Sequence, residues 1–131
     1  MSRYTCIYFP TAGNRYPVEE LIDSLGEATQ RKYFYKIDLL ESFGPLLPEP
    51  HAKKVDKREG IYELRFKGSD GQVRVLYFFF DKDQIILTNG FIKKTNKLPK
   101  DELQKAIQRR RIYITDLNRQ EIRKAVKKKK K

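Results

Sequence analysis

The chain has 131 residues, which fits one compact domain, because a second one would be too small to support its own hydrophobic core. Lysine and arginine outnumber aspartate and glutamate by 29 to 17, and the net charge of +12 favours a polyanionic partner, nucleic acid ahead of an anionic membrane surface. One cysteine and one histidine argue against a disulfide framework, a zinc cluster and a serine triad. No apolar run reaches the length of a membrane span or a signal peptide, so we expect a cytoplasmic protein with no membrane partner.

The N-terminal residues predict a strand followed by a helix. Residues 3–9 alternate between two faces and are rich in β-branched and aromatic side chains, which is typical of a strand, with Cys6 as a small buried hydrophobe. Apolar residues then recur at helical spacing from Val18 to Leu25, directly after Pro17, which suits the first turn of a helix. Gly26 is expected to end this helix.

A second helix is predicted from about residue 27 to residue 43, with a stop at the glycine and proline that follow. The two helices are expected to form a hairpin. Residues 44–60 contain three prolines and a basic cluster, and we expect a loop that either contacts phosphate or is simply a solvated surface. His51 lies in this loop, where a lone histidine is more often a bystander than a catalyst.

Two strand-like runs, "IYELRF" and "VRVLYFFF", flank a glycine-bracketed turn, and each contains one arginine. If Lys67 pairs with Gln72, one face of the hairpin is wholly apolar, which supports this register because a one-residue slip would reverse every side chain. Arg65 then lies opposite Arg74, although like charges in that position repel. A bound anion would explain the pair, and neutralisation by Glu63 on a solvated surface is the simpler alternative.

A third run, residues 85–92, completes a three-stranded antiparallel meander. We expect Phe78 opposite Leu87 and Arg74 opposite Phe91.

This pairing places Lys93 on the arginine face, and a different parity of the preceding turn would place Lys94 there instead. Either lysine would complete a cationic pocket with the two arginines. Guanidinium and ammonium groups suit a phosphodiester that gains charge in a transition state.

The C-terminal part predicts a helix from about Pro99, a short helix over residues 116–126, and a basic tail from residue 127 that solubilises the chain or attracts RNA weakly.

The segments "GIYELRFKGSDGQVRVLYFFF" and "GFIKKTNKLPKDEL" resemble the HigB-like, phage-type branch of the RelE/ParE superfamily of toxins from type II toxin–antitoxin systems. The resemblance covers roughly residues 4–114, so we assign residues 1–114 to a toxin domain and residues 115–131 to a helical extension and basic tail. It implies an α+β fold in which an N-terminal strand and a helical hairpin pack on a twisted antiparallel sheet, followed by a C-terminal helix.

The resemblance also implies a metal-independent endoribonuclease that needs no cofactor and cuts mRNA on the ribosome. It places the basic site positions of the family on Arg65, Arg74, Lys93 and Lys94. We expect the arginines to stabilise the pentacoordinate phosphorane and a lysine to assist electrostatically or donate a proton, with Glu63 a base only if it points into the pocket. The candidate RNA-binding residues are Lys53, Lys54, Lys57, Arg58, Lys67, Lys97, Arg109, Arg110 and Arg111.

The expected partners are mRNA on the ribosome, ribosomal RNA, and a HigA-like antitoxin that carries a helix-turn-helix. Two other classes remain open. A ParE-like gyrase inhibitor would have the same fold but would not need the four basic positions, so their presence argues against it. A non-catalytic RNA-binding module would fit the charge equally well. New cuts within translated mRNA would separate the nuclease from both.

Overall fold

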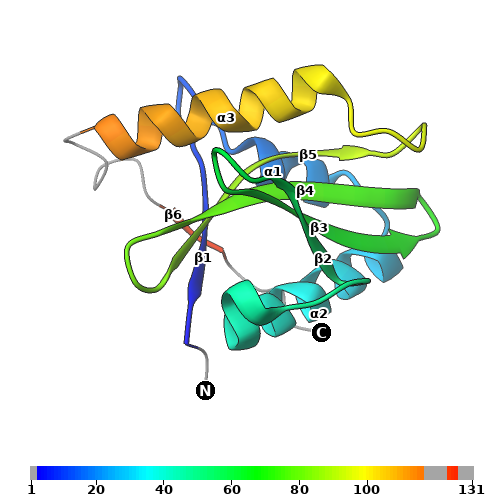
Figure 1. The fold of residues 1–131 in the computed structure, drawn as a ribbon. Coiled ribbons are helices and arrows are strands. Elements are labelled where there is room, and N and C mark those ends of the chain that lie inside the picture. Colours follow the sequence, from blue (N-terminus) through cyan, green and yellow to red (C-terminus); the bar gives the residue numbers. More distant parts are fainter. Residues whose placement is uncertain (1–2, 117–123, 127–131) are drawn as a thin grey trace.

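The computed structural model describes residues 3–116 and 124–126 (Figure 1). Its elements in chain order are β1 (Thr5–Tyr8), α1 (Pro17–Asp23), α2 (Glu27–Phe43), the 3₁₀ turn η1 (Gly44–Leu46), β2 (Ala52–Asp56), β3 (Ile61–Gly68), β4 (Gly71–Phe80), β5 (Gln84–Ile92), α3 (Lys100–Thr115) and β6 (Lys124–Ala125). The α+β class, the two N-terminal helices, the meander and the C-terminal helix are confirmed. Within the described residues, no helix has the length and apolar character that crossing a bilayer requires.

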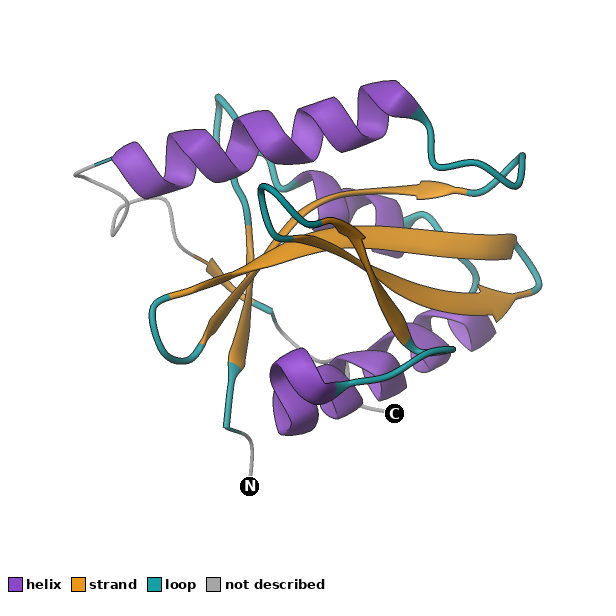
Figure 2. Cartoon of the chain, in the orientation of Figure 1, coloured by secondary structure: helices purple, strands orange, loops and turns teal. Residues whose placement is uncertain are grey.

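The strands form one sheet in the order β2-β3-β4-β5-β1-β6. In Figure 2 α3 lies along one face of this sheet, and α1 and α2 lie on the other. The meander β3-β4-β5 is antiparallel as expected, and β1 extends the sheet by running parallel to β5, with Thr5 paired to Gln84. Between β1 and β5 the chain forms both N-terminal helices and the strands β2, β3 and β4. It passes from β1 to the edge strand β2 and then returns strand by strand, so that β5 lies beside β1.

Each face of the sheet has its own hydrophobic core. The face under α1 and α2 buries Val18, Ile22, Tyr33, Ile37, Leu64, Val75 and Leu87. The face under α3 buries Ile7, Leu76, Phe78, Ile86, Ala106 and Tyr113. Pro17 begins α1, and acidic residues occupy its first turn, where their negative charge interacts favourably with the positive end of the helix dipole. Side chains that alternate along β3 and β4 therefore divide between two apolar layers, and the arginines belong to the α3 side.

The predicted hairpin register is confirmed. Lys67 pairs with Gln72 and Arg65 lies opposite Arg74. Pairing continues to Gly68 and Gly71, so the turn between the strands has two residues.

The predicted register of β5 is half correct. Arg74 lies opposite Phe91 as expected, but Phe78 pairs with Ile86 instead of Leu87. A bulge at Thr88 shifts the register by one residue, and the Thr88 hydroxyl donates to the carbonyl of Leu76 at 3.1 Å.

The prediction that residues 44–60 form only a loop is wrong. Residues 52–56 form β2, an edge strand antiparallel to β3 in which Lys53 pairs with Glu63. Lysine-rich edge strands are common because the charges discourage pairing with another chain, but they lack the apolar alternation that marks a strand in sequence.

The predicted short helix over residues 116–126 is wrong where the structure describes it. Residues 124 and 125 form β6, which pairs with Ile7 and Tyr8 of β1. Residues 117–123 and the predicted basic tail over 127–131 lie outside the described residues.

The turn between β3 and β4 is fixed to the start of α2. The Asp70 carboxylate accepts a hydrogen bond from the backbone N–H of Gly26, the residue before α2, at 2.9 Å. This hydrogen bond lowers the pKa of Asp70 below its ordinary value of 3.8. The contact orients the hairpin that carries both arginines relative to α2.

We predict that Asp70→Ala lowers the urea midpoint of unfolding at pH 7, because α2 loses an N-terminal acceptor. Since the folded pKa of Asp70 is lowered, its contribution is fully present above pH 3.8 and is lost as the pH falls through the lower folded pKa. Unfolding titrations from pH 7 to pH 3 should therefore show the gap between the wild type and Asp70→Ala closing. Ser69→Ala in the same turn is the control and should show no such pH dependence. A gap that persists unchanged at pH 3 would contradict this role.

Candidate functional site

A pocket of about 250 Å³ opens on the sheet face beside the N-terminal end of α3. Its polar lining consists of Lys53, Lys54, Glu63, Arg65, Arg74, Lys93, Asn96 and Lys97. Val55, Phe91 and Leu98 form its apolar wall. We call it the cationic pocket, because six basic side chains line it and Glu63 is the one acidic residue among the described residues that do so. The pattern suits a phosphate ester with an attached nucleoside.

Glu63 explains why two arginines can face each other across the hairpin. One carboxylate oxygen lies 3.2 Å from Nε of Arg74 and 3.6 Å from Nε of Arg65. The Glu63 side chain is 6% exposed, and that of Arg74 is 8% exposed. Arg65 also approaches Glu49 at 3.8 Å, but the Glu49 side chain is 64% exposed. A single buried carboxylate thus acts as the counterion of both guanidiniums, which lets them face each other.

The arginine pair keeps an excess of positive charge. Arg74 donates to the carbonyl of Val73 at 3.1 Å and to the side-chain oxygen of Gln72 at 2.9 Å. Its Nε and that of Arg65 are buried and have no partner of hydrogen-bond geometry. Burial lowers the pKa of Arg74, Glu63 opposes this, and Arg65 adds to it. Two guanidiniums share one negative charge here, so the pocket presents fixed donors to an anion.

The structure distinguishes between the two candidate lysines. Lys93 donates its backbone N–H to the carbonyl of Gln72 at 2.7 Å and lines the cationic pocket, as the pairing of Arg74 with Phe91 predicts. Lys94 points elsewhere and lines a second, more apolar groove with Leu21 and Pro99. The predicted group of Glu63, Arg65, Arg74 and Lys93 is therefore brought together, and Lys94 is not part of it.

The predicted RNA-binding residues are spread over several surfaces. Lys53 and Lys97 line the cationic pocket, and so does Lys54, which also lies over the ring of Tyr62 at 5.5 Å. Lys57 and Arg58 are exposed on the turn between β2 and β3. Lys67 is exposed beyond the arginines, near the tip of the hairpin.

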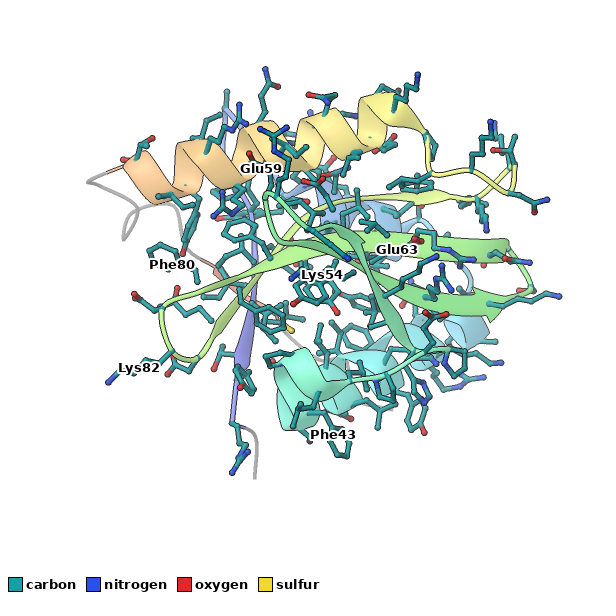
Figure 3. The ribbon with its side chains drawn as sticks, in the orientation of Figure 1. Phe43, Lys54, Glu59, Glu63, Phe80 and Lys82 are labelled. Atoms are coloured by element: carbon teal, nitrogen blue, oxygen red, sulfur yellow. The ribbon has the colours of Figure 1, made fainter. Side chains whose placement is uncertain are left out.

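The three consecutive arginines of α3 make contacts within the protein. Arg109 donates to the carbonyl of Thr88 at 2.8 Å, and burial lowers its pKa. Arg110 and Arg111 both pair with Glu59 on the β2–β3 turn, at 3.1 Å and 2.7 Å. Figure 3 shows Glu59 close to α3. These contacts hold α3 to the sheet, and none of the three arginines lines the cationic pocket.

Comparison with known protein families shows which family the chain belongs to. A family model for the phage-derived Gp49-like proteins (DUF891) matches residues 20–111. The chain belongs to the Gp49-like family. This is a RelE-like toxin family associated with toxin–antitoxin systems. A search among curated proteins gave no significant match. The matched segment contains both arginines, Glu63 and Lys93, and ends within α3.

One residue near the arginine pair, Lys36, was missed at the level of sequence, and another, His51, was set aside. Lys36 of α2 places its Nζ 2.7 Å from Nδ1 of His51. The His51 carbonyl in turn accepts a hydrogen bond from the Arg65 backbone at 2.9 Å. Helical periodicity places Lys36 next to buried Ile37 but gives no sign that its side chain reaches the sheet edge. In the described part of the chain, no three His, Cys, Asp or Glu side chains are grouped so that they could hold a metal ion.

We predict that Glu63→Gln lowers the free energy of unfolding by roughly 2–4 kcal/mol, because two arginines lose their buried counterion. Sulfate should stabilise this variant more than it stabilises the wild type at equal ionic strength, since the anion replaces the carboxylate. Urea unfolding with sulfate or chloride measures both effects. The matched control is Glu49→Gln, which removes the exposed partner of Arg65 and should change stability little. Wild-type stability in Glu63→Gln would contradict the counterion role.

Proposed function

We propose that this protein is the toxin of a type II toxin–antitoxin system and cleaves mRNA on the ribosome at the cationic pocket. The observation that carries the proposal is the arrangement of Arg65 and Arg74 around one buried carboxylate, with Lys93 beside them. Membership of a RelE-like toxin family supports the same conclusion. The finer assignment to the HigB-like branch rests on the "YELR" and "GFIKKT" segments.

The proposed chemistry uses the RNA as its own nucleophile. The 2′-hydroxyl loses its proton and attacks the adjacent phosphorus, the P–O5′ bond breaks, and the leaving oxygen takes up a proton. Arg65 and Arg74 stabilise the charge that develops on the phosphorane oxygens, and the Lys93 ammonium adds charge and can donate a proton. We assign Glu63 to positioning the two arginines rather than to the role of base.

The ribosome supplies what the pocket lacks. The mRNA path and decoding centre would align the 2′-hydroxyl with the phosphorus, which reduces the demands on acid and base groups. Basic residues outside the pocket, such as Lys57 and Arg58, would contact ribosomal RNA through charge. A HigA-like antitoxin with a helix-turn-helix is the proposed neutralising partner, and it would cover the entrance of the cationic pocket.

We predict that Lys93→Gln reduces mRNA cleavage by at least about tenfold, because one cation near the reacting phosphate is lost. Lys94→Gln is the matched control, since it removes the same charge from the adjacent residue, which lines another groove. Primer extension on cellular mRNA after brief expression, together with growth curves, measures the effect. Equal losses in the two variants would contradict the placement of the site. Absence of new cuts with the wild type would favour a gyrase inhibitor or a non-catalytic RNA-binding module.

A further inference from the structure

A second pocket shares both arginines with the cationic pocket. It has a volume of about 270 Å³ and is lined by Lys36, Pro50, Arg65, Phe66, Lys67, Gln72 and Arg74. We call it the edge pocket, because it lies where β3 becomes the edge of the sheet. Pairing of β2 with β3 begins at Ala52 and Leu64, so the following β3 residues have no β2 partner. The arginine pair therefore stands between two pockets.

The charge of the edge pocket is unbalanced. Four of its lining side chains are cationic, and none of the described residues that line it is acidic. Neither of the two acids that pair with the arginines lines this pocket: Glu63 lines the cationic pocket, and Glu49, 3.8 Å from Arg65, has a largely exposed side chain. Lys36 and Lys67 therefore add positive charge beside an arginine pair that shares one carboxylate, and a bound anion would offset the resulting repulsion. The charge of this surface therefore favours an anionic ligand.

Lys36 is held so that its charge stays available. Its Nζ lies 2.7 Å from Nδ1 of the His51 ring, and an imidazole, unlike a carboxylate, carries no negative charge that would cancel that of the ammonium. Two N–H groups of Lys36 remain for a ligand. His51 is fixed in turn by its own backbone N–H, which donates to Pro48, and by its carbonyl, which accepts from Arg65. Burial lowers the pKa of Lys36, and the neighbouring Lys32 contributes. A phosphate bound beside it would relieve that cost.

We propose that the edge pocket binds the RNA phosphate next to the scissile one, with Lys36 as its ligand. The RNA strand then crosses the β3–β4 hairpin, and Arg65 and Arg74 lie between two consecutive phosphates. This inference rests on the proposed function, because it takes the cationic pocket as the place of the scissile phosphate. It adds a binding residue from α2, an element that otherwise only covers the opposite face of the sheet.

The test uses short, uncleavable RNA. A 2′-O-methyl dinucleotide with one internal phosphate is compared with the same dinucleotide carrying an additional 5′-phosphate or 3′-phosphate. The added phosphate should improve affinity for the wild type by roughly tenfold at one of the two ends, as expected for one charge-assisted hydrogen bond. Lys36→Gln should abolish this gain and leave binding of the unphosphorylated dinucleotide nearly unchanged. Lys36→Arg should retain it.

Lys32→Gln is the matched control, because Lys32 lies one turn earlier on the same helix, is exposed and does not line the edge pocket. Lys32→Gln should keep the full gain in affinity that the added phosphate gives the wild type. Lys67→Gln, at an exposed residue of the edge pocket, is a second loss variant that tests the site independently of α2. If neither terminal phosphate improves binding, or if Lys36→Gln keeps the gain, the edge pocket is not a phosphate subsite. If the unphosphorylated dinucleotide does not bind the wild type, the proposed cationic site itself fails as well.

Discussion

The ion pairing of Glu63 with two arginines is the interaction on which the site depends. The apolar face of the β3–β4 hairpin fixes the strand register, and that register places Arg65 opposite Arg74. The two guanidiniums cannot move apart without sending core residues into water. A buried carboxylate on the same face, two residues before Arg65, compensates for their repulsion. The same residues therefore satisfy a folding constraint and create a preorganised, electropositive surface.

Contacts with α3 hold the elements around this surface in place. α3 covers the part of the sheet that carries Leu76 and Phe78, and hydrogen bonds from Asn89 to Glu102 fix its beginning. The ion pairs of Glu59 with Arg110 and Arg111 hold the β2–β3 turn against α3. Arg109, Arg110 and Arg111 are used in tertiary contacts, so not every basic residue of the chain is available to an anionic partner.

Sequence periodicity was sufficient to predict the elements that depend on residues close together in the chain. α2, the hairpin register and the start of α3 follow from apolar spacing and from glycine and proline positions, and all three are confirmed. β2 was missed because an edge strand rich in lysine has no apolar alternation. The parallel pairing of β1, the bulge at Thr88 and the strand β6 depend on contacts between distant segments. The contact of Lys36 with His51 joins α2 to the loop before β2, and no spacing rule predicts it.

The central claim is that the cationic pocket promotes attack by the 2′-hydroxyl of mRNA on its own phosphate. The most direct measurement is the chemistry of the new RNA ends made by the wild type on translating ribosomes. We predict that the upstream fragments carry 2′,3′-cyclic phosphates and the downstream fragments carry 5′-hydroxyls, because the P–O5′ bond breaks as the 2′-oxygen attacks. Upstream fragments that end in 3′-hydroxyls, with 5′-phosphates downstream, would contradict the account.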